Sequence, residues 1–240
     1  MAEAERALFR AHAAGDYVAT YLAYPIVYGP RQIQPQDWCV VRRLLDGRRR
    51  IVVADGGQKL ESRLFVRNAV AALLRAVDAP ESGAGQKFLV TDDEVHTIRQ
   101  RIEFTATVLG VDDLELVDIP YLYATPSRAL LRHEPQHRVV RNDKARGVLG
   151  YTPVVDAATA LRETVAWLVA NPPAPGGEEE ARLQDRFDYP AEDALIDAWH
   201  VATAGLAAVA GPDIAAVRSH PYRHPKSPEE GWAPRDPAST

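Results

Sequence analysis

The chain has 240 residues, of which 46% are hydrophobic and 25% charged, proportions typical of a globular protein rather than a disordered or fibrous one. Its 28 basic and 33 acidic side chains leave a net charge of −5, without the basic excess of most nucleic-acid-binding domains. Cys39 is the only cysteine, which excludes an intramolecular disulfide and a zinc site built from cysteines.

Helical and strand patterns alternate along the first 170 residues. Apolar spacing and terminal glycines predict helices at 2–14, 38–45, 68–77, 97–109, 144–149 and 157–169. Runs rich in β-branched and aromatic residues predict strands at 17–27, 50–54, 64–66, 86–91 and 114–119. This alternation predicts an α/β fold.

The composition changes after residue 170. The segment 171–182 contains three prolines, two glycines and three glutamates, which is typical of a linker. An additional segment, 183–210, is expected to hold one more helix, at 191–210. Prolines recur among few apolar residues over 211–240, which predicts a disordered tail.

Two short matches to catalytic motifs are interrupted by proline. His133 and His137 fit the H-E-x-x-H pattern of zinc proteases, which needs both histidines on one face of a helix. Pro135 stands between them and favours a loop. Tyr222 and Lys226 fit the Y-x-x-x-K pattern of reductases, but prolines at 221 and 225 oppose the helical turn that this pair needs. We therefore predict no catalytic and no metal-binding residue in this chain.

Several longer segments stand in a characteristic order. They are Y-P-I-V-Y-G-P-R at 24–31, D-G-G at 55–57, F-V-R-N-A-V-A-A at 65–72, G-Q-K-F-L-V at 85–90, D-K-A-R at 143–146 and L-G-Y-T-P at 149–153. This order resembles the second half of an extended short-chain dehydrogenase/reductase, the NAD-dependent epimerase/dehydratase family. The resemblance covers residues 1–170. It implies the C-terminal part of a Rossmann-like α/β fold, with the small substrate-binding lobe.

The resemblance also implies a function. Members of this family act on a nucleotide sugar or a related carbonyl or alcohol, with oxidoreductase-like chemistry and NAD or NADP as cofactor. The glycine-rich turn and the Tyr–Lys pair of the family's preceding half are not found in these 240 residues. We therefore expect a chain truncated to the substrate-binding half, either through a mis-called start or as a true product. The alternative is a non-catalytic binding or regulatory homologue that keeps the fold.

Six residues are candidates for ligand binding through this resemblance. Tyr24, Pro25 and Ile26 match the loop whose backbone meets the nicotinamide. On the substrate side the candidates are Tyr28, Arg31 and Arg63.

Arg63 and Arg31 are proposed for their charge. The family's phosphate-binding arginine aligns with Glu61, and a strand's period of two keeps Arg63 on the same face as that position. A plain surface arginine is the alternative for Arg63. Arg31 follows the Y-G-P turn and is a second candidate for an anionic ligand.

The expected partner is a small-molecule substrate such as a nucleotide sugar, and the resemblance implies a homodimer for the full-length enzyme. No apolar run reaches the roughly 18 residues of a membrane span, and the acidic N-terminal residues differ from a signal peptide. We therefore expect a cytoplasmic protein with no membrane and no nucleic-acid partner.

Overall fold

The computed structural model describes residues 2–132, 134–210, 222–223 and 233–234. The chain divides into two compact units, Met1–Ile196 and Asp197–Thr240. The helices of the first unit are α1 (Ala2–Ala14), α2 (Trp38–Leu45), α3 (Val66–Asp78), α4 (Pro80–Gly83), α5 (Ile98–Val108), α6 (Asp143–Leu149), α7 (Ala157–Ala170), α8 (Glu178–Leu183) and the first half of α9 (Tyr189–Thr203). Its strands are β1 (Thr20–Ala23), β2 (Ile26–Tyr28), β3 (Arg50–Ala54), β4 (Leu60–Glu61), β5 (Arg63–Phe65), β6 (Gln86–Leu89), β7 (His96–Thr97) and β8 (Glu115–Ile119), with short 3-10 helices η1 (Asp55–Gly57), η2 (Thr125–Arg128) and η3 (Leu130–Arg132).

The strands of the first unit pair mainly in parallel. β1 pairs with β6, β2 with β5 and β3 with β8 in parallel, whereas β4 and β7 are antiparallel. Parallel neighbours need long crossovers, and the helices between the paired strands provide them. The predicted α/β fold is therefore confirmed.

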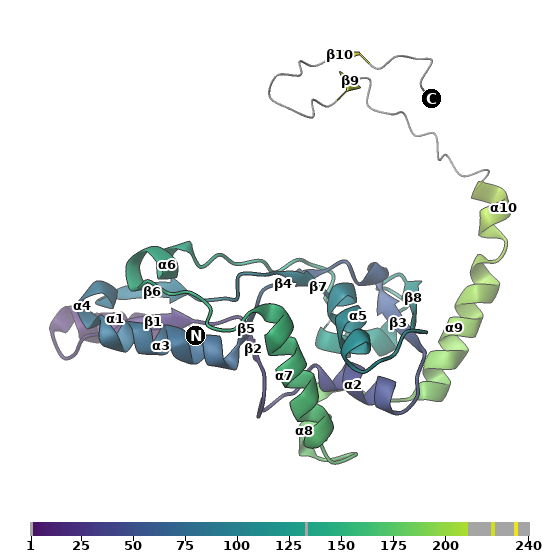
Figure 1. Cartoon of the computed structure of the whole chain (residues 1–240), viewed down its shortest axis with the longest axis horizontal. Coiled ribbons are helices and arrows are strands. Elements are labelled where there is room, and N and C mark those ends of the chain that lie inside the picture. The colour runs from purple at the N-terminus through teal and green to yellow at the C-terminus, as the bar shows by residue number, and fades with distance from the viewer. Residues whose placement is uncertain (1, 133, 211–221, 224–232, 235–240) are drawn as a thin grey trace. The chain divides into compact units, whose positions relative to one another are not determined.

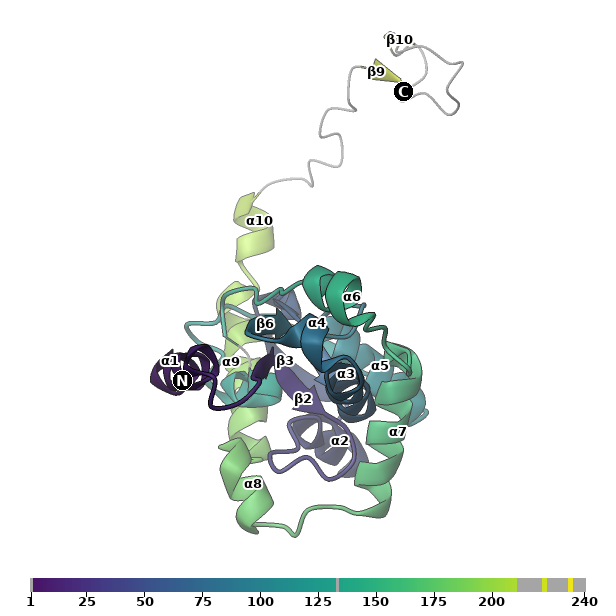
Figure 2. The same cartoon turned by 90° about the vertical axis from the view of Figure 1, so that its left-hand side faces the viewer.

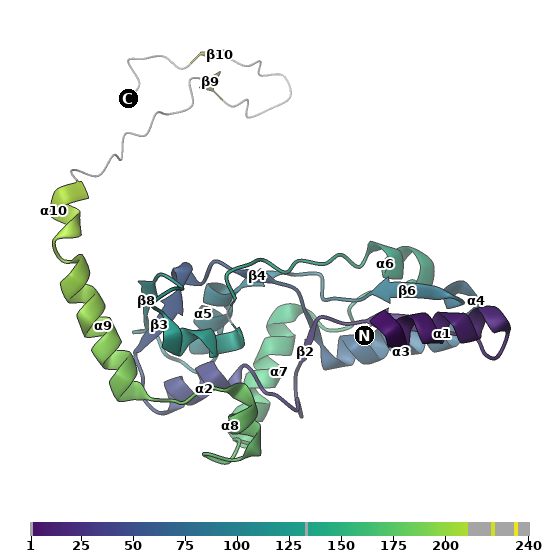
Figure 3. The same cartoon turned by 180° about the vertical axis from the view of Figure 1, so that it is seen from behind.

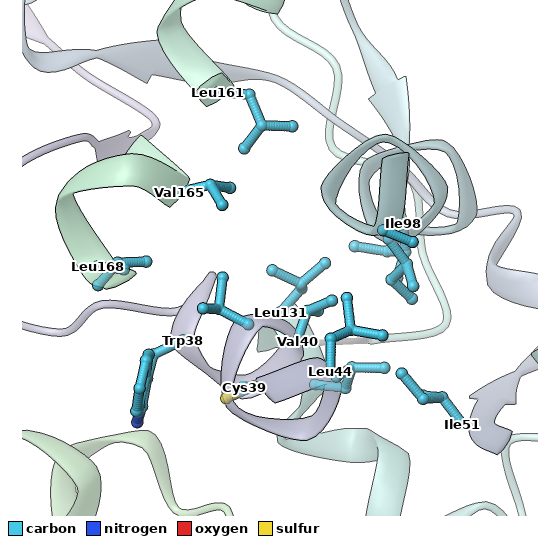
Figure 4. Packing of buried hydrophobic residues seen from close by; sticks show 14 of the residues in the cluster. Trp38, Cys39, Val40, Leu44, Ile51, Ile98, Leu131, Leu161, Val165 and Leu168 are labelled. Carbon is cyan, nitrogen blue, oxygen red and sulfur yellow. The ribbon is translucent and has the colours of Figure 1, made fainter. Parts of the chain in front are cut away.

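Two hydrophobic cores lie at opposite ends of this unit (Figures 1 and 3). At one end, the β1–β6 pair has α1 on one side and α3 on the other (Figure 2), and Phe88 of β6 packs with apolar residues of α3 and α6. At the other end, α2, α5 and α7 pack on β3 through a core that includes Val40, Ile98 and Val165 (Figure 4). Leu131, from η3, is fully buried in that second core.

Helix ends follow the local signals in the sequence. α1 and α2 have the predicted bounds, and each is followed by a glycine at positive φ, Gly15 and Gly47. α5 begins after Thr97, whose hydroxyl accepts from the Gln100 backbone while the Gln100 side chain accepts from the Thr97 backbone. Such a capping box stabilises a helix by about 1 kcal/mol.

The long strand predicted at 17–27 is wrong in one respect, because it forms two strands. β1 ends at Ala23 and β2 begins at Ile26, with Tyr24 and Pro25 between them. Proline lacks the backbone N–H that a continuous ladder would use. The two strands consequently pair with different partners, β6 and β5.

The region after residue 170 contains more structure than its composition indicates. The predicted linker holds α8, whose Glu180 is buried and accepts hydrogen bonds from Trp38 and Arg42. The helix expected at 191–210 is interrupted at 204–205, giving α9 and α10 (Leu206–Ala210). The domain division of the sequence stays a prediction.

In the second unit, β9 (Tyr222–Arg223) pairs antiparallel with β10 (Ala233–Pro234). Most of the segment 211–240, for which a disordered tail is predicted, lies outside the described residues, as does Lys226 of the Y-x-x-x-K match. No helix among the described residues is both long and apolar enough to cross a membrane.

Candidate functional site

Charged side chains are buried together between the two hydrophobic cores. We call them the ionic cluster, which consists of Asp37, Lys59, Glu61, Arg63, Asp92 and Arg101, all buried. Three are basic and three acidic, so their formal charges cancel. Burying so many charges is costly unless each is paired, so the contacts of each member decide what the cluster can bind.

Arg63 is the member with incomplete hydrogen bonding. It is 5% exposed, and its Nη2 donates to Glu61 Oε2 at 2.9 Å and to the Leu131 carbonyl at 3.2 Å. Its Nη1 finds no hydrogen-bond acceptor among the described residues. Burial, together with the like charge of Arg101, lowers the pKa of Arg63 below its ordinary value. Both effects disfavour the charged guanidinium, and an anion bound next to Arg63 would stabilise it.

Arg101 and Asp37 form a buried ion pair with two hydrogen bonds. Arg101 Nε and Nη2 donate to the two carboxylate oxygens of Asp37 at 2.7 and 3.0 Å. Burial opposes ionisation of Asp37, but the Arg101 charge and hydrogen bonds outweigh it and lower the pKa of Asp37. The Arg101 guanidinium also lies 4.3 Å from the ring centroid of Tyr28, so it is fixed on two sides.

Asp92 connects β5 and α3 to the ionic cluster through hydrogen bonds. Its carboxylate accepts from the Phe65 backbone N–H at 3.1 Å and from Asn68 Nδ2 at 2.7 Å. Burial raises the pKa of Asp92, and burial likewise raises the pKa of Tyr28. Asn68 in turn accepts from the Val155 backbone N–H, so both ends of the Asn68 side-chain amide are hydrogen-bonded.

A small cavity opens beside this network. Its volume is about 10 Å³, room for one oxygen-sized group, and Tyr28, Arg63, Asp92 and Arg101 contribute to its lining. A larger cavity of about 380 Å³ shares Arg101 and His96 with it and continues along α5 and α7. Together they could hold a small molecule with one polar oxygen directed at Arg63.

The structure brings two of the six predicted residues together. Tyr28 and Arg63 line the same cavity, and Arg63 is buried, so the alternative of a plain surface arginine is wrong. Arg63 also contacts Glu61, as the strand period of two predicts. Arg31 is exposed, has φ of 64°, and is not part of the cavity lining.

The predicted cofactor segment lies at the carboxyl end of β1. Tyr24 is 38% exposed, and its hydroxyl donates to the Ala69 carbonyl at 3.2 Å. Pro25 and Ile26 are half-buried. In open parallel sheets ligands bind at the carboxyl ends of the strands, so the segment has a suitable place in the fold. Its role stays a prediction.

Arg101 and Asp92 are site residues that sequence reasoning missed. Arg101 carried a readable signal, because it occupies a buried position in line with Ile98, Ile102 and Thr105, at spacings of three and four along α5. A charged residue on the apolar face of a helix calls for a buried partner. Asp92 had no such signal, since it stands among other acidic residues after β6.

The H-E-x-x-H match forms no helix over 134–137, and His133 lies outside the described residues. His137 Nδ1 accepts from the Leu60 backbone at 2.9 Å. Within the described ranges, no three His, Cys, Asp or Glu side chains are grouped so that they could hold a metal ion.

Comparison with known proteins identifies the fold. No family model and no curated protein matches the sequence. Three solved structures illustrate the similarity. UDP-glucuronic acid 4-epimerase from Bacillus cereus, in complex with UDP-glucuronic acid and NAD, is 16% identical over 69% of this chain and 50% of that one, with a TM-score of 0.56. UDP-glucose 4-epimerase from Thermotoga maritima, with UDP-glucose, is 24% identical over 69% and 50%, with a TM-score of 0.54. RMD from Pseudomonas aeruginosa, complexed with NADPH, is 20% identical over 70% and 53%, with a TM-score of 0.54.

Over 69–70% of its length, the chain shares the fold of part of each of these three proteins. This confirms, at the level of the fold, the resemblance to the NAD-dependent epimerase/dehydratase family. The chain spans about half the length of the structures that it matches.

The epimerase/dehydratase fold implies a nicotinamide dinucleotide, and the residues of this chain fit only one edge of it. The segment Tyr24–Ile26 could meet the nicotinamide through its backbone. A dinucleotide also needs a glycine-rich turn between a strand and a helix, and the 240 residues contain no such sequence.

Proposed function

We propose that this chain forms the nucleotide-sugar-binding part of an NAD(P)-dependent epimerase/dehydratase. The observation that carries the proposal is Arg63, whose buried Nη1 has no acceptor among the described residues and which lines a cavity that shares residues with a larger one. Leaving such a donor unpaired costs free energy, and an oxygen of a bound phosphate or sugar would recover it. The fold shared with enzymes that hold UDP-glucose and UDP-glucuronic acid supports this substrate class.

In this proposal the ionic cluster orients the substrate. Arg63 donates to one substrate oxygen, while Arg101 is held by Asp37 and Tyr28 and supplies a fixed positive charge beside it. Arg31, exposed after the Y-G-P turn, would contact an anionic group from outside the cavity. Tyr24, Pro25 and Ile26 would meet the nicotinamide of NAD or NADP. A cytoplasmic location and a homodimer belong to the same proposal.

A binding titration tests the role of Arg63. The purified 240-residue chain is titrated with UDP-glucose by isothermal calorimetry, alongside Arg63→Met and Arg67→Met. Arg67 is a matched control, since it is exposed and pairs with Glu163. We expect Arg63→Met to weaken binding by at least about tenfold, because a charge-assisted hydrogen bond is lost, and Arg67→Met to bind like the parent.

Two outcomes oppose the proposal. Equal binding by Arg63→Met, in a variant whose circular dichroism and melting match the parent, would remove Arg63 from the site. An absence of UDP-glucose binding by the parent chain would remove the substrate class. The non-catalytic alternative is tested separately, with protein purified from its source: it predicts binding of UDP-glucose without any conversion of the sugar when NAD is supplied.

A further inference from the structure

A second pair of cavities lies around η2, away from the residues that line the cavities beside Arg63. The larger has a volume of about 530 Å³ and is bounded by η2 on one side and residues 184–192 on the other. The smaller, about 260 Å³, is bounded by η2, η3 and residues near Gln34. Arg128, Ala129 and Gln184 belong to both, so the two cavities adjoin. Residues 184–192 lie beyond the stretch for which the family resemblance was found, whereas η2, η3 and Gln34 lie within it.

Two of the three acidic residues of the larger cavity are buried against one arginine of the protein. Asp185 and Glu192 both bind the buried Arg43, through the contacts Nη1 to Asp185 Oδ2 at 2.6 Å and Nη2 to Glu192 Oε1. These three side chains are only 2–3% exposed. The Asp188 carboxylate accepts from the Ala191 backbone at the start of α9. Arg43 offsets one of these three negative charges, and Asp188 is the exposed carboxylate that a ligand would meet.

The arginines of the two cavities are, by contrast, available. Arg186 of the larger cavity and Arg132 of the smaller one are exposed, and neither side chain makes a hydrogen bond or ion pair with any residue in the described ranges. Arg128, common to both, donates through Nη2 to the Tyr121 and Leu122 carbonyls, and its guanidinium lies 4.9 Å from the centroid of the Tyr121 ring. Three guanidinium groups thus border one continuous space, each with N–H donors to spare.

The backbone around these cavities is held in an unusual conformation. Arg132, Gln184 and Phe187 have φ of 53°, 60° and 49°. Residues other than glycine rarely adopt this left-handed backbone conformation. The Arg132 carbonyl is held there by Lys59 Nζ at 3.1 Å. Residues kept in such conformations cluster at ligand sites, because the surrounding contacts must impose them.

We propose that these adjoining cavities form a second ligand site, for a small organic molecule with two phosphate groups. One phosphate would lie between Arg128 and Arg186, and the other would reach Arg132 across the shared boundary. Guanidinium groups bind phosphate through paired N–H donors, and two separated cationic positions select two anionic groups. The site is independent of the substrate proposed at Arg63.

Fructose 1,6-bisphosphate and fructose 6-phosphate serve as probes of this site. Each is titrated into the 240-residue chain by isothermal calorimetry, and into Arg132→Gln, Arg186→Gln and Arg75→Gln. Arg75 is the matched control, an exposed arginine on α3. We expect the bisphosphate to bind at least about tenfold more tightly than the monophosphate, and either cavity variant to bring the two affinities together. Arg75→Gln should behave as the parent does.

Three results would overturn the proposal. The first is no binding of the bisphosphate at millimolar concentration by the folded parent chain. The second is equal weakening in Arg75→Gln, which would indicate nonspecific attraction to surface charge. The third is competition by UDP-glucose together with loss of UDP-glucose binding in Arg186→Gln, which would make this the substrate site. Loss of UDP-glucose binding in Arg63→Met alone leaves the second site standing, so the two proposals fail separately.

Discussion

Single buried charges decide how this molecule binds and how it responds to acid. Asp37 is 1% exposed and forms both of its charge-assisted hydrogen bonds with one residue, Arg101. Arg101 stacks on Tyr28, and both residues line the cavity beside Arg63. A change at Asp37 should therefore affect both stability and the shape of the site.

Substitution of Asp37 by Asn should destabilise the protein by about 3 kcal/mol at neutral pH, because it leaves the Arg101 charge buried and unpaired. The pKa of Asp37 is lowered in the folded state, so its contribution is complete above the ordinary value of 3.8 and is lost as pH falls through the folded value. The difference from the parent should shrink at about pH 3. Urea unfolding followed by tryptophan fluorescence at both pH values measures it.

The control for this prediction is Asp113→Asn. Asp113 pairs with Arg49 at the surface and is 75% exposed, so its removal should cost almost nothing at either pH. An Asp37→Asn deficit that is equal at both pH values would contradict the linkage argument.

At the scale of elements, one turn and one set of long-range ion pairs fix the positions of strands and helices. The turn η1 carries the chain from β3 toward β4 and brings Gly57 against α5, within reach of the Arg99 backbone. The start of α9 is fastened to α2 by Arg43, whose partners Asp185 and Glu192 lie 142 and 149 residues further along the chain. Neither feature can be read from composition, which predicted a linker at 171–182 and an additional helix after it, but no contact with α2.

Substitution of Gly57 by Ala should destabilise the protein by about 3 kcal/mol, from backbone strain and crowding together. Gly57 has φ of 68°, and a Cβ there would lie 2.7 Å from Val53 Cγ1 and 2.9 Å from the Arg99 nitrogen. Gly47→Ala separates the two causes, since Gly47 has φ of 82° and open space around it. It should cost about 1 kcal/mol, from strain alone. Thermal unfolding compares the two variants, and equal melting temperatures would refute the crowding argument.

At the scale of the whole first unit, exposed apolar surface determines the tendency to self-associate. α3 carries Val70, Leu73, Leu74 and Val77, which are 49%, 50%, 54% and 64% exposed, at spacings of three and four that form one stripe. The nearby β1–β6 pair forms a sheet of two strands in the described part of the chain, fewer than most sheets have. An apolar stripe beside a small open sheet favours association.

We predict that the isolated 240-residue chain is poorly soluble and self-associates as its concentration rises. The double variant Leu73→Lys, Val77→Lys should weaken self-association by at least about tenfold, since each substitution removes a large apolar contact. Val154→Lys is the control, because Val154 is 63% exposed and lies outside the stripe. Sedimentation velocity measures all three proteins. A parent chain that remains monomeric at every concentration would contradict the prediction.

The sequence by itself determined the α/β class, most of the helices and strands, and the resemblance to the epimerase/dehydratase fold. Periodicity, capping residues and glycines act over a few neighbouring positions, so α1, α2 and β3 were predicted with their observed bounds. Only the tertiary structure decided that Arg63 Nη1 lacks an acceptor among the described residues, that Arg101 binds Asp37 across 64 positions, and that Arg43 binds α9. These contacts join residues distant in the chain, and the sequence carries no local signal for the pairing of charges that folding brings together.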